Sequence, residues 1–211
     1  LLVGGKGDDT ISVDSPFDVV VELAGGGNDS LEAFTDIWLP EHMENLQVFP
    51  SGGVNHFGVG NDRPNLINGW FGNETLYGQG GDDTINGFDG ADALAGGAGS
   101  DSLFGGFGED LYVLFDAAES PVDAPDRIRG FGAIEGQTDY LDLRPIDADI
   151  NAEGNNAFGW AAALTGVAGQ LVREVDGEDL LVLGDVDGDG LADFAVRLLQ
   201  RADLTEVPAL L

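Results

Sequence analysis

The chain has 211 residues, enough for one domain of ordinary size or two small ones. Its 39 acidic residues against 8 basic ones give a formal charge of -31, which excludes nucleic acid and anionic membrane surfaces as partners and favours a cation. The 34 glycines exclude a mainly helical protein, because each internal glycine costs a helix about 1 kcal/mol. Cysteine is absent, which excludes disulfides and thiolate metal sites.

The chain begins without Met and in the middle of a glycine-rich motif, GGKGDDTIS at 4–12. We therefore expect it to be the C-terminal part of a longer protein with an upstream domain. No run of about 18 apolar residues occurs in the sequence, so no membrane span is predicted.

A nine-residue period runs through residues 69–113, which divide into GWFGNETLY, GQGGDDTIN, GFDGADALA, GGAGSDSLF and GGFGEDLYV. Positions one and four are always glycine, position six is acidic, and position eight is apolar or aromatic. The same template recurs at 4–12 and 24–32, whereas 60–68 is a degenerate copy in which we expect weak or no ion binding. The sixth positions are Asp9, Asp29, Asn65 (in the degenerate copy), Glu74, Asp83, Asp92, Asp101 and Asp110, and the eighth positions of 69–113 are Leu76, Ile85, Leu94, Leu103 and Tyr112.

Each unit reads as six turn residues followed by a three-residue strand whose middle side chain points inward. Two units would form one coil of a right-handed parallel β-roll, so that residues eighteen apart stack about 4.8 Å from each other. Stacked carboxylates repel one another unless a cation lies between them. Ca²⁺ accepts six to eight oxygen ligands in relaxed geometry, whereas Mg²⁺ wants near-ideal octahedra, and Zn²⁺ and copper lack nitrogen and sulfur ligands here. We expect about 3 to 7 calcium ions; the alternative, solvated Asp-Gly turns, would not require a fixed period.

The pattern GGxGxDxUx resembles the calcium-binding repeat of RTX proteins. Beyond the repeats, the chain resembles the C-terminal β-roll and secretion region of serralysin-type metalloproteases. The residues that carry this second resemblance are LPEHMENLQV at 39–48, DRIRGFGAIEGQTDYLDLRPIDAD at 126–149, GNNAFGW at 154–160, AGQLVREV at 168–175, GDVDGDGLADFAVRL at 184–198 and the ending LTEVPALL.

The resemblance implies that each ion is held by the second, fourth and sixth residues of one loop and by the first, third and sixth of the loop eighteen residues later, with only the sixth using its side chain. Two sites are then expected, one among Gln79, Gly81, Asp83, Gly96, Ala98 and Asp101, the other among Phe88, Gly90, Asp92, Gly105, Phe107 and Asp110. A third would use Trp70, Gly72, Glu74, Gly87, Asp89 and Asp92, although Glu and Trp depart from the pattern. A fourth would use Gly5, Gly7, Asp9, Ala24, Gly26 and Asp29, spaced by twenty residues because 13–23 forms an oversized half-coil.

A different acidic loop, DVDGDGLAD at 185–193, resembles an EF-hand loop without its twelfth-place Glu. Its candidate ligands are Asp185, Asp187, Asp189 and Asp193. The alternative is an acidic turn that joins the two strands of a hairpin.

The pattern divides the chain into a calcium-binding roll at 1–113, with an irregular insertion at about 33–59, and a β-rich cap at 114–211. The cap would cover the open end of the roll, because an exposed coil edge invites pairing between chains. The end of the chain, Glu206 followed by VPALL, resembles the C-terminal signal that type I ABC exporters recognise; the alternative is an apolar tail packed on the cap.

No catalytic motif is found: the zinc-binding string HExxH is absent, and neither His42 nor His56 has a Glu in the required phase. We therefore do not expect the chain itself to be an enzyme. The favoured hypothesis is a secreted, extracellular module that folds on calcium and is exported through its C-terminus. The alternatives are an adhesive or surface-layer module, or a non-catalytic tail required by an upstream hydrolase such as a metalloprotease.

Overall fold

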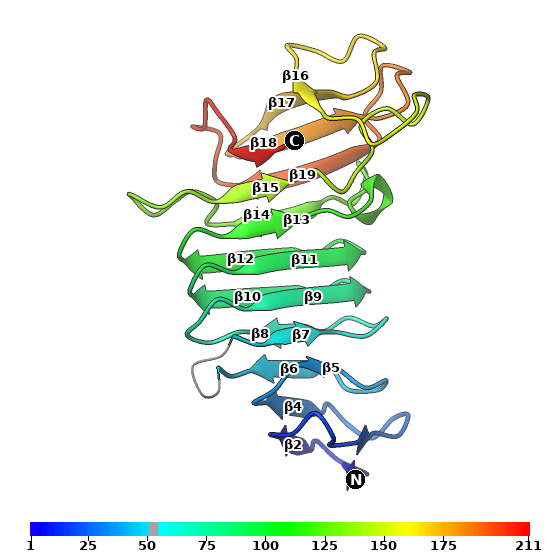
Figure 1. Ribbon diagram of the computed structural model, residues 1–211, viewed down its shortest axis with the longest axis vertical. Helices are drawn as coiled ribbons and strands as arrows, with labels where there is room; N and C mark the ends of the chain where they lie inside the picture. The colour runs from blue at the N-terminus through cyan, green and yellow to red at the C-terminus, as the bar shows by residue number, and fades with distance from the viewer. Residues whose placement is uncertain (51–54) are drawn as a thin grey trace.

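A computed structural model describes residues 1–50 and 55–211. Two long sheets run along the molecule, and the chain winds between them as a stack of coils with the cap at one end (Figure 1). The larger sheet contains, in chain order, β2 (Thr10–Val13), β4 (Ser30–Ala33), β6 (Asn45–Val48), β8 (Leu66–Asn68), β10 (Thr84–Asp89), β12 (Ser102–Phe107), β14 (Asp126–Arg129), β16 (Gly159–Trp160), β17 (Gln170–Asp176), β18 (Asp179–Asp185) and β19 (Phe194–Leu199). The smaller contains β5 (Ile37–Trp38), β7 (Phe57–Val59), β9 (Thr75–Gly80), β11 (Ala93–Ala98), β13 (Leu111–Val113), β15 (Tyr140–Asp142) and β20 (Ala209–Leu210). A separate pair is formed by β1 (Leu2–Val3) and β3 (Val20–Val21), and one 3₁₀ turn, η1, spans Ala117–Glu119.

The strand register confirms the predicted parallel β-roll. Successive strands alternate between the two sheets, and residues eighteen apart are parallel partners, as in Ile85 with Leu103 and Leu94 with Leu76. The strands β9 to β12 are six residues long rather than the predicted three, because pairing continues into the next unit, as in Phe88 with Gly106. The chain bends within these strands at left-handed residues, φ 77° at Phe88 and 98° at Gly97.

In residues 69–113 the interior of the roll is a column with one apolar side chain from each half-coil. The predicted inward residues of 69–113 are all buried, and the column continues in both directions along the stack. Its members are Ile11, Leu31, Leu46, Ile67, Leu76, Ile85, Leu94, Leu103, Tyr112, Ile128 and Leu141. Because each strand of the repeats 69–113 offers this column a single central position, this part of the roll has a thin core for its length.

The stretch predicted as an irregular insertion, about 33–59, contributes regular strands. The strand β6 pairs in parallel with both β4 and β8, and β7 pairs with β5 and β9, so the coil continues through it. The irregularity is in the spacing of the strands, which departs from nine residues, and not in their pairing. Residues 51–54 of this stretch lie outside the described residues.

The region after residue 113 extends both sheets. The strands β14 and β15 continue the parallel stack, and β19 then pairs with β14 and begins the antiparallel run β17–β18–β19. The predicted hairpin on either side of 185–193 is therefore confirmed as β18 and β19. Within the described parts of the chain, no helix is long and apolar enough to cross a membrane.

The thin core makes each inward side chain important. Leu94 is fully buried in the middle of the column, so Leu94→Ala should lower the free energy of unfolding by about 2–5 kcal/mol. Urea denaturation in saturating calcium measures this loss. Leu191→Ala, at a residue that is 69% exposed, is the control and should change the stability little; equal losses in the two variants would contradict the column.

Candidate metal centre

Two ladders of acidic side chains run along the roll, one just before the strands of each sheet. The first ladder comprises Asp9, Asp29, Glu44, Asn65, Asp83, Asp101 and Asp126. In the nine-residue repeats, the backbone N–H of each ladder residue donates to the carboxylate of the ladder residue in the following coil. Asn65 donates to Asp83 Oδ1 over 2.7 Å, and Asp83 donates to Asp101 Oδ1 over 2.7 Å. The N–H of Asp101 then donates to Asp126 Oδ1 over 2.9 Å. The predicted stacking of Asn65, Asp83 and Asp101 is thus observed.

The second ladder comprises Glu74, Asp92, Asp110 and Asp139 and follows the same rule. The N–H of Glu74 donates to Asp92 Oδ1 over 2.8 Å, and that of Asp92 to Asp110 Oδ1 over 3.0 Å. The N–H of Asp110 donates to Asp139 Oδ1 over 3.1 Å. Each of these three acceptor carboxylates therefore uses one oxygen to hold the preceding coil in place.

The second oxygen of most of these carboxylates is buried and has no hydrogen-bond partner among the described residues. These oxygens are Asp9 Oδ2, Asp29 Oδ2, Glu74 Oε1, Asp83 Oδ2, Asp92 Oδ2, Asp101 Oδ2 and Asp110 Oδ2. A buried polar atom without a partner costs about 1–3 kcal/mol, and more when it is charged. Such a cost, repeated at one phase of the sequence, indicates that these oxygens are positioned to bind a cation. Only oxygen ligands are offered, the donor set that Ca²⁺ prefers.

Glycine at the first position of each unit leaves room beside these free oxygens. A Cβ built on Gly78 would lie 2.2 Å from Asp83 Oδ2 and 2.4 Å from the Gly96 carbonyl oxygen. A Cβ on Gly96 would lie 2.0 Å from Asp101 Oδ2, and one on Gly105 2.0 Å from Asp110 Oδ2. The space is therefore bounded by a carboxylate oxygen and, at Gly78, also by a carbonyl oxygen, as a calcium ligand shell requires.

Burial raises the pKa of the ladder carboxylates. It raises the pKa of Asp83 and of Asp126 to about 8, that of Asp92 to about 7, and those of Asp101 and Asp110 to about 6. The charges of stacked neighbours add to the effect, that of Asp101 on Asp83 and that of Glu74 on Asp92. A bound cation would act in the opposite direction, because it favours the ionised form.

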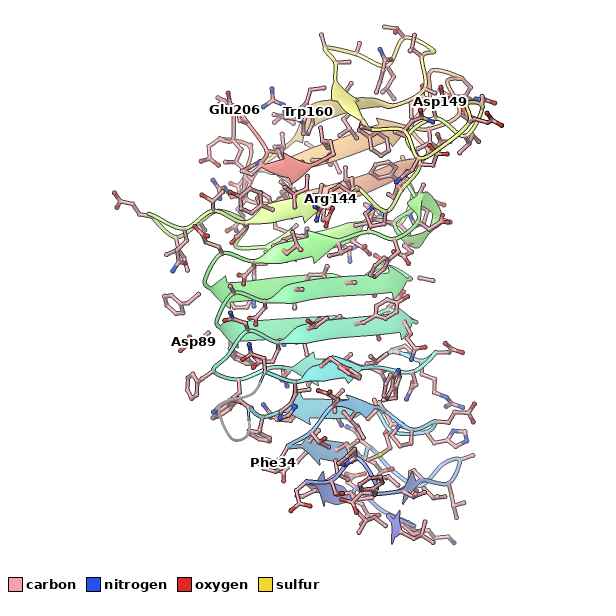
Figure 2. The ribbon with its side chains drawn as sticks, viewed as in Figure 1. Phe34, Asp89, Arg144, Asp149, Trp160 and Glu206 are labelled. Carbon is pink, nitrogen blue, oxygen red and sulfur yellow. The ribbon has the colours of Figure 1, made fainter. Side chains whose placement is uncertain are left out.

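The structure brings together the acid pair of each predicted repeat site. All four sites share a second hydrogen bond between neighbouring coils. The N–H of the fourth-position residue donates to the carbonyl of the third-position residue in the following coil. The four pairs are Gly81 to Ala98, Gly90 to Phe107, Gly72 to Asp89, and Gly7 to Gly26. In the fourth site the N–H of Asp9 donates to Asp29 Oδ1 over 2.8 Å, despite the twenty-residue spacing. Asp89 lies at the edge of the stack in Figure 2. The individual ligands remain predictions.

The degenerate unit replaces a carboxylate with amides. Asn65 donates through Nδ2 to the Met43 carbonyl over 3.3 Å and to Asn61 Oδ1 over 3.2 Å. Asn61 donates through its own Nδ2 to the carbonyls of Pro40 and Met43, over 2.9 and 2.8 Å. Here side-chain amide N–H groups donate hydrogen bonds to the carbonyl oxygens. A cation is not needed to satisfy these oxygens, and this is a physical reason for the weak or absent ion binding predicted at 60–68.

The loop 185–193 brings together three of its four predicted ligands. Asp185, Asp187 and Asp193 each offer an oxygen within 4.8 Å of the other two. Asp189 instead accepts from the Leu191 N–H over 2.7 Å. Both oxygens of Asp185 accept backbone N–H groups, from Gly188 and Gly190, as an acidic turn without metal also would. Ion binding here remains a prediction.

Three ladder acids, Glu44, Asp126 and Asp139, and the nearby Glu22 were absent from the predicted ligand sets. A sequence signal exists for three of them, because an acid stands two residues before a buried column residue: Glu44 before Leu46, Asp126 before Ile128, and Asp139 before Leu141. The same spacing holds in the repeats. Glu22 has no such signal, since it lies in the oversized half-coil.

The comparisons with known proteins agree with a repeat-built calcium-binding roll. The RTX calcium-binding nonapeptide repeat is matched in four copies, over residues 1–15, 57–85, 69–103 and 86–113. These parts of the chain are RTX calcium-binding repeats, and RTX repeats bind calcium.

Similar proteins include the endo-1,3-1,4-beta-glycanase ExsH of Rhizobium meliloti, which is 38% identical over 75 residues. That alignment covers 36% of this chain but only 16% of the glycanase. The AlgE6R2 subunit of the Azotobacter vinelandii mannuronan C5-epimerase is 26% identical, with a TM-score of 0.53, over 72% of this chain and 90% of the subunit. The AlgE6R3 subunit of the same enzyme is 28% identical, with a TM-score of 0.47, over 71% and 78%. The resemblance to serralysin-type proteins remains a prediction.

The glycine spaces allow a matched pair of substitutions. Gly96→Ala places its Cβ 2.0 Å from Asp101 Oδ2 and should weaken calcium binding at one site at least tenfold. Gly159→Ala meets no atom within 4 Å and should leave calcium affinity unchanged. Calorimetric titration with CaCl₂ measures both. Unchanged affinity in the Gly96 variant would show that no ion uses this space.

The raised pKa values give the metal-free protein an unusual pH dependence. An acid whose pKa is raised by folding binds more protons folded than unfolded, so its contribution to stability is complete below about pH 4 and is lost as pH rises to about 8. In EGTA the folded fraction, followed by β-type circular dichroism, should therefore decrease as the pH rises from 5 to 8. In saturating calcium the trend should be reversed, because calcium competes with protons for the carboxylates. A metal-free folded fraction that increases with pH would contradict buried, unpaired acids.

Proposed function

We propose that the chain is a calcium-dependent folding and export module of a secreted protein, and that it carries no catalytic site of its own. The observation that carries this proposal is the row of buried carboxylate oxygens without partners, which occur at one phase of the coil. A protein that must leave the cell unfolded gains from such a device, because the acids oppose folding until a cation is supplied.

The proposed ions lie between stacked coils, held by carboxylates of the two ladders and by turn carbonyls. Two ions use the ligand sets of Asp83 with Asp101 and of Asp92 with Asp110. Others lie at Glu74 with Asp92 and at Asp9 with Asp29, and the loop 185–193 is a further candidate. The total is 3 to 7 ions.

Calcium supplies the free energy that the thin core lacks. Extracellular modules bind calcium with Kd values near 10⁻⁴ to 10⁻³ M, and a ligand at ten times its Kd stabilises the folded state by about 1.4 kcal/mol. Four such sites would contribute about 5–6 kcal/mol, comparable with the whole stability of a small domain. Cytosolic calcium is too low to fill sites of this affinity, so folding would follow export.

The position of the C-terminus supports export before folding. In the folded chain β20 pairs with β15, through Ala209 with Leu141 and Leu210 with Asp142, and Val207 is buried. Glu206 lies in the cap (Figure 2). A type I ABC exporter could read these residues as a signal only while they are free of the sheet, that is, before the roll folds outside the cell.

We propose further that the upstream domain is an enzyme acting on a glycan. The similarity to a β-glycanase and to a subunit of a mannuronan C5-epimerase supports this view over the metalloprotease alternative. The adhesive or surface-layer alternative has no comparable support.

Far-ultraviolet circular dichroism tests the switch. The β-type spectrum of the chain in 5 mM CaCl₂ should collapse toward that of an unfolded chain in excess EGTA and return when calcium is restored. Magnesium at the same concentration is the control and should not restore the spectrum. A β-spectrum that is the same in EGTA and in calcium would contradict the proposed function.

A further inference from the structure

A cluster of three carboxylates lies near β1 and β3, at the end of the roll opposite the cap. Asp9, Glu22 and Asp29 each offer one oxygen within 4.8 Å of those of the other two. Asp9 and Asp29 are the sixth-position acids of their repeats. Glu22 comes from the oversized half-coil 13–23. We call these three residues the end cluster.

Free, buried oxygens point to a ligand at the end cluster. Asp29 is completely buried; its Oδ1 accepts the Asp9 N–H over 2.8 Å, and its Oδ2 has no partner among the described residues. Asp9 Oδ2 is likewise buried without a partner. Glu22 is only 6% exposed and is positioned by the N–H groups of Gly5, over 3.3 Å, and of Leu23, over 2.7 Å. In the described parts of the chain, no basic side chain forms an ion pair with any of the three acids.

Two glycines give Glu22 access to the cluster. A Cβ on Gly4 would lie 1.8 Å from Glu22 Oε2 and 3.3 Å from Asp9 Oδ2, so these two carboxylate oxygens lie on either side of the same small space. A Cβ on Gly26 would lie 2.5 Å from Glu22 Oε1 and 3.0 Å from the Gly5 carbonyl oxygen. Both Gly5 and Gly26 belong to the predicted ligand set of this site. Glu22 therefore reaches the space in which the repeat pattern places an ion.

We propose that Glu22 is a third carboxylate ligand of the calcium ion at this end, and that this ion binds more tightly than those inside the roll. The proposal rests on the proposed calcium function. Interior sites pair two acids, whereas the end cluster presents three negative charges to one ion. Ligand charge is one of the factors that set calcium affinity, and the attraction is strong where water is excluded.

The fold gives a tight site at this end a mechanical role. The strand β2 is the last strand of the larger sheet and pairs on one side only, with β4. An end coil of a repeat protein lacks half of the neighbour contacts that stabilise interior coils. An ion shared by the loop before β2, the half-coil that carries β3 and the loop before β4 would fix three segments at once and protect an open sheet edge.

Hydrogen exchange during a calcium titration tests the assignment. The concentration of CaCl₂ that half-protects the β2 and β4 amides is measured in the whole chain, in Glu22→Gln and in Asp14→Asn. Gln keeps the shape of the side chain and an oxygen that can accept from Gly5 and Leu23, but removes the charge. Asp14 is an exposed acid of the same half-coil outside the end cluster, so its variant controls for the loss of one negative charge. Amides of β10 and β12 provide an interior reference.

In the unaltered chain β2 and β4 should become protected at lower calcium than β10 and β12. Glu22→Gln should raise the half-protecting concentration for β2 and β4 at least tenfold, with full protection recovered at higher calcium, while Asp14→Asn changes it less than twofold. If β10 and β12 do not respond to calcium at all, the proposed function fails. If they respond but Glu22→Gln leaves β2 and β4 unchanged, only the role of Glu22 is overturned. A loss that higher calcium cannot restore would show Glu22 to be structural and would also overturn the proposal.

Discussion

The roll depends on one constraint, which is that carboxylates are stacked in register and buried at a spacing where they repel. In the repeats, one oxygen of a ladder acid accepts the N–H of the preceding coil, as Asp101 Oδ1 does from Asp83, and the other oxygen has no hydrogen-bond partner among the described residues. The parallel register that aligns the apolar column aligns the acids as well, so the chain cannot form one without the other. Under the proposed function, a cation between coils resolves the conflict and makes the fold conditional on its supply.

Each ladder acid of the repeats lies two residues before the inward apolar residue of the same half-coil. This spacing links the acid ladders to the apolar column. Along a strand, side chains alternate between faces, so the residue two before an inward Leu or Ile also faces inward, at the point where the strand begins. Asp92 and Leu94 illustrate the result, with both side chains buried. The first-position glycine then removes the Cβ that would otherwise clash with the sixth-position carboxylate, as at Gly96 with Asp101.

The ladder positions carry different chemical groups along the stack. Inside the repeats the carboxylates are left for an ion. At Asn61 and Asn65, amide N–H groups meet the carbonyl oxygens instead. Near the cap, protein groups close the ladders, since the Asp126 N–H donates to the Ser120 hydroxyl and Asp139 Oδ2 accepts the Gly132 N–H. At the opposite end Glu22 brings a third carboxylate to Asp9 and Asp29, so the two ends of the roll differ in their chemistry.

The sequence by itself determined the repeat, the coil of two units, the inward residues and the acid pairs, because a strict nine-residue period with strand alternation leaves a single way to stack. It could not determine where Glu22 would lie, since this acid comes from a half-coil whose length departs from the period. It also could not show that 33–59 keeps the coil or that the cap continues the same sheet through β14 and β19. Those features depend on pairing between strands far apart in the chain, which only the tertiary structure decides.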